Sequence, residues 1–277
     1  MGIRLDGKVA AANIKENLKK EFSLLNNKAC LAIIHFDDMA SNSYLKGRMK
    51  IADELGVSIK TYKIDESYTT NDILKLVNEL NNDSMVNGIM IDRPLPKKYD
   101  EFLILSSISS NKDVDGYTPF NLGKLLSNKD CFYSATPYAA IRLLEYYNVD
   151  LEGKNVLVIG RSVNVGKPLA NLLLNKNATV TIAHSKTKDL KSMIKNYDFV
   201  FLALGKANFV NVEDVNENIG VIDIGINFDE FNKICGDANK EIYDVVKYYS
   251  PVPGGVGVMT NVVLMENLLK ACKNQLS

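Results

Sequence analysis

Two groups of polar residues in the first half of the chain could line a binding site. Tyr44 and Arg48 lie four residues apart in a segment that predicts a helix, so their side chains share one helix face. The polar loop 111–117 places Asp113 and Asp115 close together. A carboxylate of this loop could bind a ring edge, or the loop could be a turn of the Asx type. By spacing alone, Tyr44 and Arg48 fit an exposed helix face better than a site.

The second half contains a strand, a tight turn and a helix of the kind that binds a dinucleotide. The strand from Asn155 ends at Gly160, and Gly166 falls on the first turn of the following helix. Such glycines permit close packing of strand and helix, and the helix N-terminus offers free backbone N–H groups to a pyrophosphate. Ser162 takes the place of the middle glycine of the usual Gly-x-Gly-x-x-Gly pattern, so a turn without a ligand is the alternative.

The end of the next strand indicates which dinucleotide is bound. Residues 178–183 form an apolar strand that runs into the segment 184–188, His-Ser-Lys-Thr-Lys, where an NAD site usually has a carboxylate. Ser185 contributes a hydroxyl there, and Arg161 lies in the preceding turn. This set of hydroxyls and bases suits a 2′-phosphate, so NADP is expected rather than NAD. The alternative is a basic loop in solvent.

Three further loops lie where a parallel sheet could bind a ligand. The segments 203–205 and 224–227 each follow a predicted strand, at the carboxyl edge of the sheet. Their glycines could let the backbone approach a cofactor, or they could be ordinary turn glycines. The segment 250–260 is a rigid, apolar loop rich in proline and glycine, which fits a wall against a flat ligand or a domain connector.

Predicted strands and helices alternate along the chain, which indicates an α/β fold with a mainly parallel sheet. Helices are predicted over 8–25, 41–55, 69–80, 136–147, 165–174 and 261–272, and strands begin at residues 31, 58, 88, 155, 178, 199 and 220. A boundary near residue 137 divides the chain into two domains. The first comprises residues 1–136 and the terminal helix 260–277, and the second comprises residues 137–259.

Composition bounds the class of protein. The chain has 277 residues, of which 46% are hydrophobic, and 33 basic residues balance 33 acidic ones. Zero net charge gives no field for nucleic acid or an anionic membrane. No secretory signal and no apolar run of about 18 residues is visible, so a cytoplasmic protein is expected. The four cysteines and two histidines show no disulfide or metal-site spacing, so no metal is expected.

Together, four motifs resemble the bifunctional methylenetetrahydrofolate dehydrogenase/cyclohydrolase family over nearly the whole chain. They are KDVDG at 112–116, GRSVNVGKP at 160–168, HSKT at 184–187 and PVPGGVGVMT at 251–260. The resemblance implies a three-layer α/β folate-binding domain, completed by the last helix, and a Rossmann-type NADP domain, with the active site in a cleft between them. It also implies a homodimer. The reaction would be oxidation of 5,10-methylene-tetrahydrofolate with NADP, followed by hydrolysis of the methenyl product to 10-formyl-tetrahydrofolate.

The resemblance also implies roles for individual residues. Tyr44 matches a tyrosine that stacks on folate, and Asp115 matches an aspartate that hydrogen-bonds the pterin. The positions that match NADP contacts, or residues near the cofactor and the cleft, are Thr136, Gly160, Arg161, Ser162, Ser185, Ile226 and Thr260. The folate is further expected to contact Pro253, Gly254 and Gly255.

Two departures from the family pattern should affect the two activities of the family differently. Arg48 stands where the family has lysine, and Asp92-Arg93 stands where it has Gln-Leu. Hydride transfer depends mainly on positioning and on the cofactor. Hydrolysis needs proton transfer, and an arginine cannot be deprotonated in a protein. We therefore expect Tyr44, Arg48, Asp92 and Asp115 to form the catalytic set, with Arg48 and Asp92 as a compensating ion pair and with hydrolysis weakened or lost.

Two other functions fit parts of the pattern. An NADP dehydrogenase for a shikimate-like acid shares the two-domain plan, but the Pro-Gly-rich loop and KDVDG argue against it. A folate- or NADP-binding protein without catalytic activity is the non-enzymatic alternative, and it is favoured only by Arg48 and Asp92.

Overall fold

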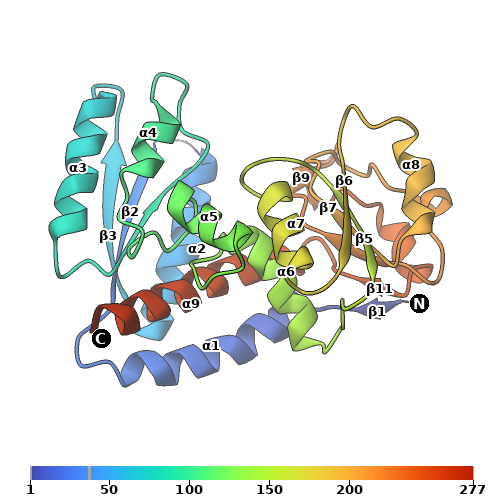
Figure 1. The fold of residues 1–277 in the computed structure, drawn as a ribbon, viewed down its shortest axis with the longest axis horizontal. Helices are drawn as coiled ribbons and strands as arrows, with labels where there is room; N and C mark the ends of the chain where they lie inside the picture. The colour runs from blue at the N-terminus through green and yellow to red at the C-terminus, as the bar shows by residue number, and fades with distance from the viewer. Residues whose placement is uncertain (1, 37–38, 277) are drawn as a thin grey trace. The chain divides into compact units, whose positions relative to one another are not determined.

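The computed structural model describes residues 2–36 and 39–276 and divides the chain into two compact units (Figure 1). Unit 1 comprises residues 1–12 and 134–263, and unit 2 comprises residues 13–133 and 264–277. The boundaries fall inside helix α1 (Gly7–Ser23) and inside helix α9 (Val256–Leu276). Each of these two helices therefore contributes residues to both units.

Unit 2 is built on a parallel three-stranded sheet in the order β3–β2–β4. Its strands are β2 (Cys30–Phe36), β3 (Ser58–Ile64) and β4 (Gly88–Ile91). Every residue of β2 and β4 is buried, as expected for parallel strands that are covered on both faces. Its helices, besides the parts of α1 and α9, are α2 (Met39–Leu55), α3 (Thr70–Asn82), α4 (Glu101–Ser106) and α5 (Pro119–Leu126).

The core of unit 2 follows from the alternation of side chains along its strands. One face of β2 and β4 packs with the buried face of α3 and with α4 in a single apolar cluster. On the other face α9 approaches so closely that a Cβ on Gly88 would lie 2.9 Å from a methyl of Leu268. Helices therefore cover both faces of the sheet, as the three-layer α/β prediction requires.

Unit 1 contains a parallel six-stranded sheet in the order β1–β11–β8–β7–β5–β6. Its strands are β1 (Ile3–Arg4), β5 (Asn155–Ile159), β6 (Thr179–Ala183), β7 (Phe199–Leu202), β8 (Gly220–Asp223) and β11 (Tyr248–Tyr249). The remaining elements are α6 (Ala135–Tyr146), α7 (Gly166–Leu174), α8 (Leu190–Met193), the 3₁₀ turns 194–196, 212–214 and 240–244, and an antiparallel hairpin of β9 (Asn227–Phe228) and β10 (Ile234–Cys235). The predicted α/β fold with a mainly parallel sheet is confirmed.

Residues 1–12 group with unit 1, whereas the sequence-based division puts them in the other domain. β1 pairs with β11, and the Gly7 N–H donates to the Gly254 carbonyl at 2.9 Å. A Cβ on Gly7 would lie 2.0 Å from the Gly255 carbonyl oxygen, so this contact requires glycine. A two-residue strand has too little periodicity to be detected from sequence.

Helix boundaries follow local chemistry, with two differences from the sequence-based expectation. Thr69 caps α3, and Asp72 completes a reciprocal capping box, which agrees with the predicted start of this helix at residue 69. Helix α6 begins at Ala135, one residue before the predicted start at residue 136, with Ser134 as its N-cap. The last helix begins at Val256, five residues before the predicted start at residue 261. No helix in the part of the chain that the structure describes is long and apolar enough to span a membrane.

Candidate active site

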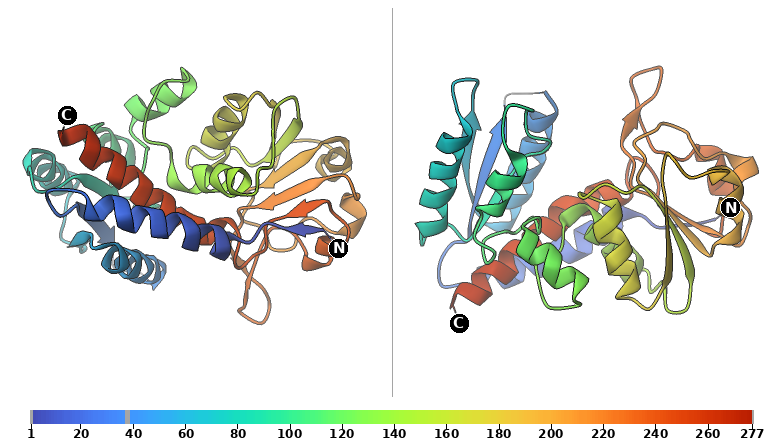
Figure 2. Two further views of the ribbon diagram at one scale, coloured as in Figure 1. Left: turned by 90° about the horizontal axis from the view of Figure 1, so that it is seen from below. Right: turned by 45° about the horizontal axis from the view of Figure 1, so that its top comes forward.

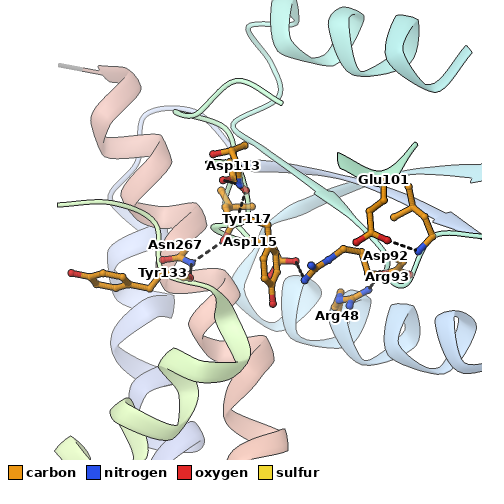
Figure 3. Close-up of polar contacts among 12 residues, drawn as sticks. Arg48, Asp92, Arg93, Glu101, Asp113, Asp115, Tyr117, Tyr133 and Asn267 are labelled. Atoms are coloured by element: carbon orange, nitrogen blue, oxygen red, sulfur yellow. Dashed lines mark hydrogen bonds and ion pairs between the residues drawn. The ribbon is translucent and has the colours of Figure 1, made fainter. Parts of the chain in front are cut away.

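The carboxyl end of the unit 2 sheet holds a buried ion pair. Arg48 lies on the inward face of α2, and Asp92 directly follows β4, where its N–H donates to the Ile34 carbonyl at 2.9 Å. Arg48 Nη1 and Asp92 Oδ1 are 2.5 Å apart, and both side chains are nine-tenths buried (Figure 3). The predicted ion pair is present. The backbone of Tyr44 belongs to α2, but its side chain lies outside the described part of the structure.

The two carboxylates of the 112–117 loop have different tasks. Asp113 builds the turn, because its carboxylate accepts the Tyr117 and Thr118 N–H groups at 3.1 and 2.8 Å and the Asn121 side-chain amide at 2.8 Å. The buried Lys112 ammonium donates to two carbonyls at the end of α3. Asn267 of α9 donates to the Val114 carbonyl at 2.8 Å. These three sets of hydrogen bonds fix the loop. Asp115 is not among the residues that make them, so its carboxylate can serve the site.

Asp115 is buried among charged side chains of both signs. Burial raises the pKa of this carboxyl to about 7, while the nearby guanidiniums of Arg93 and Arg48 counteract the rise and the carboxylates of Asp113 and Asp92 add to it. The site therefore contains a carboxyl that changes its charge near neutral pH. Such a group can hydrogen-bond the edge of a polar ring in either protonation state, with different partners in each.

Arg93 and Tyr117 belong to the same site, although the sequence pattern did not place them there. Arg93 Nη2 lies 4.0 Å from Asp115 Oδ2, and its Cζ lies 3.2 Å from the centroid of the Tyr117 ring. The available signal was the position of Arg93 beside Asp92 at the end of a buried strand. The site of unit 2 thus brings the guanidiniums of Arg48 and Arg93 next to the carboxylates of Asp92 and Asp115 (Figure 3).

The turn between β5 and α7 in unit 1 depends on its two glycines. Gly160 has φ +145°, and a Cβ there would lie 2.4 Å from the Ala203 carbonyl oxygen. A Cβ on Gly166 would lie 2.1 Å from the Gly160 carbonyl oxygen. Ser162 Oγ accepts the Val165 and Gly166 N–H groups at 3.1 and 3.4 Å. The start of α7 is therefore packed closely onto the end of β5, and the Ser162 hydroxyl binds the N–H groups at this start.

Basic and hydroxyl side chains gather beside this turn, at the end of β6. Arg161 Nη1 lies 3.4 Å from His184 Nε2, so the predicted neighbours meet in space. The Thr187 hydroxyl accepts the His184 N–H at 2.9 Å, which holds the segment in a turn, and Ser185 is exposed on it. This donor set fits a phosphate on the adenosine ribose of a dinucleotide. Arg161 and Ser185 would hold that phosphate, and the 160–166 turn would hold the pyrophosphate.

Two buried aspartates that the sequence pattern did not single out shape the loops after β7 and β8. Asp237 accepts the N–H groups of residues 204, 205 and 206 at 2.7 to 3.2 Å. Asp223 accepts N–H groups of Gly225, Asp237 and Ala238, and burial raises its pKa to about 7. A Cβ on Gly225 would lie 2.4 Å from the Asp237 carboxylate. These acids hold the two loops in one conformation.

The remaining predicted cofactor and folate positions also lie in unit 1. Ile226 follows β8 and is 47% exposed, while Thr136 and Thr260 are partly buried in α6 and α9. Pro253 is exposed, whereas Gly254 and Gly255 are buried against the start of α1. The segment 250–255 is a loop, as predicted, and residues 256–260 belong to α9.

Unit 1 has a parallel sheet with a glycine turn and donors suited to phosphate groups, and unit 2 of the same chain has a buried cluster of acidic and basic side chains. Together these features are those of a dinucleotide-dependent α/β enzyme. Two family models cover most of the chain. The catalytic domain of tetrahydrofolate dehydrogenase/cyclohydrolase matches residues 5–115, and the NAD(P)-binding domain of the same enzymes matches residues 134–276. The chain belongs to the tetrahydrofolate dehydrogenase/cyclohydrolase family, as its motifs predict.

Full-length relatives agree with this assignment. The bifunctional protein FolD of Clostridium novyi is 43% identical over 281 residues, which cover 99% of this chain and all of that protein. The crystal structure of the bifunctional FolD enzyme from Campylobacter jejuni superposes with a TM-score of 0.97 at 42% identity, covering 99% of each chain. The Trypanosoma brucei enzyme, solved with NADP and an inhibitor, has a TM-score of 0.94 at 29% identity and covers 99% of this chain and 98% of its own.

The shikimate-type alternative shares the fold alone. A shikimate dehydrogenase solved with NADP is 13% identical, with a TM-score of 0.53 over 90% of this chain and 96% of its own. Because the family models match both parts of the chain, this alternative is wrong.

Proposed function

We propose that this protein oxidises 5,10-methylene-tetrahydrofolate to the 5,10-methenyl form with NADP, and that its hydrolysis of the methenyl product is weak or absent. The full-length family match carries the first part. NADP, when bound, supplies the hydride acceptor. The residues of the chain itself bind and orient the folate. In this proposal Asp115 contacts the pterin edge, and Tyr44 packs on the ring. Arg161 and Ser185 favour the 2′-phosphate, which distinguishes NADP from NAD.

The Arg48–Asp92 pair carries the second part of the proposal. Hydrolysis requires a group that accepts a proton from water near the methenyl carbon. A guanidinium keeps its protons at any pH at which the protein folds, and the 2.5 Å contact with Asp92 occupies the carboxylate that could otherwise act as a base. Oxidation depends less on this pair than hydrolysis does, because it requires mainly positioning of the substrate and the bound cofactor.

The test of the proposed function is a paired assay on the full chain. Reduction of NADP and of NAD with methylene-tetrahydrofolate is followed separately from the disappearance of added methenyl-tetrahydrofolate. We expect NADP-dependent oxidation with a clear preference over NAD, together with methenyl hydrolysis that is far slower. Binding of both ligands without turnover would favour the non-enzymatic alternative. Hydrolysis as fast as oxidation would contradict the assignment made to Arg48 and Asp92.

The double variant Arg48→Lys/Asp92→Gln is expected to raise methenyl hydrolysis by about tenfold or more, because positioned proton transfer contributes at least this much. A lysine beside the Arg93 cation can lose its proton, and a glutamine does not hold it as an ion pair. Oxidation is expected to change by less than about threefold. The single variant Arg48→Lys is the matched control, since its lysine stays paired with Asp92 and gains little hydrolysis. Equal hydrolysis by the single and double variants would show that Asp92 has no such influence.

We further propose that the protein is a homodimer whose interface includes the β9–β10 hairpin. Figure 2 shows this hairpin projecting from unit 1. Its apolar side chains are exposed: Phe228 at 61%, Phe231 at 72% and Ile234 at 43%. Three large apolar side chains exposed on one short hairpin are more than the scattered single residues of an ordinary surface, and this favours an interaction site. A second copy of the chain is the partner that the family resemblance implies.

The variant Phe228→Ser/Phe231→Ser is therefore expected to weaken self-association by roughly 30-fold or more, the usual cost of truncating buried aromatic anchors. Analytical ultracentrifugation over a concentration series measures this. Phe102→Ser is the matched control, because Phe102 is 73% exposed on α4, in the other unit. A dimer that survives the hairpin substitutions unchanged would place the interface elsewhere.

A further inference from the structure

Arg93 is a largely buried cation of unit 2 that forms an ion pair with Asp115. It follows β4 by two residues, and its side chain is only 10% exposed. The distance from Arg93 Nη2 to Asp115 Oδ2 is 4.0 Å (Figure 3). Asp115 is itself buried, so this pair is screened little by solvent.

Tyr117 holds the same guanidinium from another side. The Arg93 Cζ lies 3.2 Å from the centroid of the Tyr117 ring, which is within the range of a cation–π contact. Tyr117 is buried, and the turn built by Asp113 fixes its backbone through a 3.1 Å hydrogen bond. The loop that carries Asp115 thus also supplies the platform on which its cation lies. A planar guanidinium suits such a platform better than an ammonium does.

The other cation of the site has a different partner. Arg48 is bound to Asp92 at 2.5 Å, and so its charge is largely balanced by that carboxylate. Asp92 and Arg93 are adjacent in sequence and add one charge of each sign to the site. Among the described contacts, Asp92 pairs with Arg48, and Arg93 lies within ion-pair distance of Asp115.

We propose that Arg93 is a positioning residue that favours the ionised form of the Asp115 carboxylate at the pterin edge of the folate, and so raises folate affinity at neutral pH. This inference rests on the proposed function. It gives Arg93 a task that the family pattern does not contain, since that pattern has leucine at this place. The pterin edge presents N–H donors, and an ionised carboxylate accepts two of them side by side.

The charged groups around Asp115 determine how the removal of Arg93 would change the pKa of Asp115. They are Arg93, Arg48, Asp113 and Asp92. With all four present, burial raises the pKa of Asp115 to about 7. Loss of Arg93 leaves two carboxylates and one paired cation near this group, so its pKa rises further. The protonated acid accepts one hydrogen bond fewer, so folate binds less well at neutral pH and recovers as the pH increases.

Arg93→Leu and Arg93→Lys test the proposal in the full chain. For Arg93→Leu we expect the KM for methylene-tetrahydrofolate near pH 7 to rise by about tenfold or more, as for loss of a charged hydrogen bond. kcat should change much less, and the KM defect should shrink as the pH is raised above neutral, where the carboxyl ionises again. Arg93→Lys should retain most of the wild-type pH profile, because it keeps the charge. Arg142→Leu, which removes an arginine paired with Glu145 in α6 at 2.9 Å, is the matched control.

A measurement without catalysis separates this proposal from the proposed function. The carboxyl carbon of Asp115, assigned by its loss in Asp115→Asn, is titrated by NMR in the wild type and in Arg93→Leu. A midpoint that moves to higher pH in Arg93→Leu supports the role of Arg93, even if no folate oxidation is found. An unchanged midpoint, or an unchanged KM profile in an active enzyme, overturns it. If Arg93→Leu does not fold, the decision falls to Arg93→Lys, whose midpoint must stay near that of the wild type.

Discussion

Replacing Arg48 alone by methionine is expected to lower the free energy of unfolding by about 3 to 5 kcal/mol, the usual cost of breaking a buried ion pair from one side. The substitution leaves the Asp92 carboxylate, whose side chain is 8% exposed, without the guanidinium that lies 2.5 Å away. It also removes one of the two cations that offset the burial of Asp115. Asp92→Leu alone is expected to be costly for the mirror-image reason, because it leaves the Arg48 cation buried.

The double variant Arg48→Met/Asp92→Leu is expected to lose less stability than the sum of the single variants, with a coupling of about 2 kcal/mol or more. Urea unfolding followed by far-UV circular dichroism measures all four proteins, since the chain has no tryptophan. The matched control is the cycle Lys273→Met/Glu21→Leu, which removes an ion pair of 2.6 Å whose side chains are about half exposed. Its coupling should stay below about 1 kcal/mol. Equal coupling in the two cycles would mean that burial adds nothing to the Arg48–Asp92 pair.

Sequence periodicity predicted the central strands and the helices between them, because these segments are long and buried. It did not detect β1 and β11, which have two residues each, or the short helices α4 and α5. It also began α9 five residues late. The segment 254–257 reads Gly-Gly-Val-Gly, and glycine has a low helix propensity, yet the helix starts at Val256 because tertiary packing overrides propensity. Local pattern is weakest where long-range contacts decide the backbone.

Some features of the candidate site could likewise be predicted from the sequence, and others could not. The pairing of Arg48 with Asp92 could be predicted, since opposite charges occur together at two positions that the family places in one site. The separate tasks of Asp113 and Asp115 could not, because they depend on which backbone N–H groups the turn directs at each carboxylate. Asp237 had no signal at all: it is an isolated acid whose three N–H partners come from a loop more than 30 residues away.

A substitution in the turn between β5 and α7 is also expected to have a large effect on stability and on NADP binding. Gly166→Ala is expected to destabilise unit 1 by about 3 kcal/mol, at the upper end of overpacking. It is also expected to weaken NADP binding on the order of 100-fold, because a hydrogen bond to a charged phosphate contributes roughly 1.5 to 3 kcal/mol and the displaced N–H groups would lose such bonds. A Cβ on this residue would lie 2.1 Å from the Gly160 carbonyl oxygen and 2.8 Å from the Arg161 nitrogen. Both are backbone atoms, so the clash cannot be relieved by turning a side chain.

The relief must come from moving the start of α7 away from the end of β5, which displaces the N–H groups that hydrogen-bond the Ser162 hydroxyl. Gly153→Ala is the matched control in the same unit, because Gly153 has φ +69° and no atom within 4 Å of its Cβ position. It should cost about 1 kcal/mol of stability through backbone strain and leave NADP affinity unchanged. Calorimetric titration of the folded variants with NADP measures the difference. If Gly166→Ala bound NADP as tightly as Gly153→Ala, the phosphates would not depend on this turn, and the dinucleotide would have to bind at another edge of the sheet.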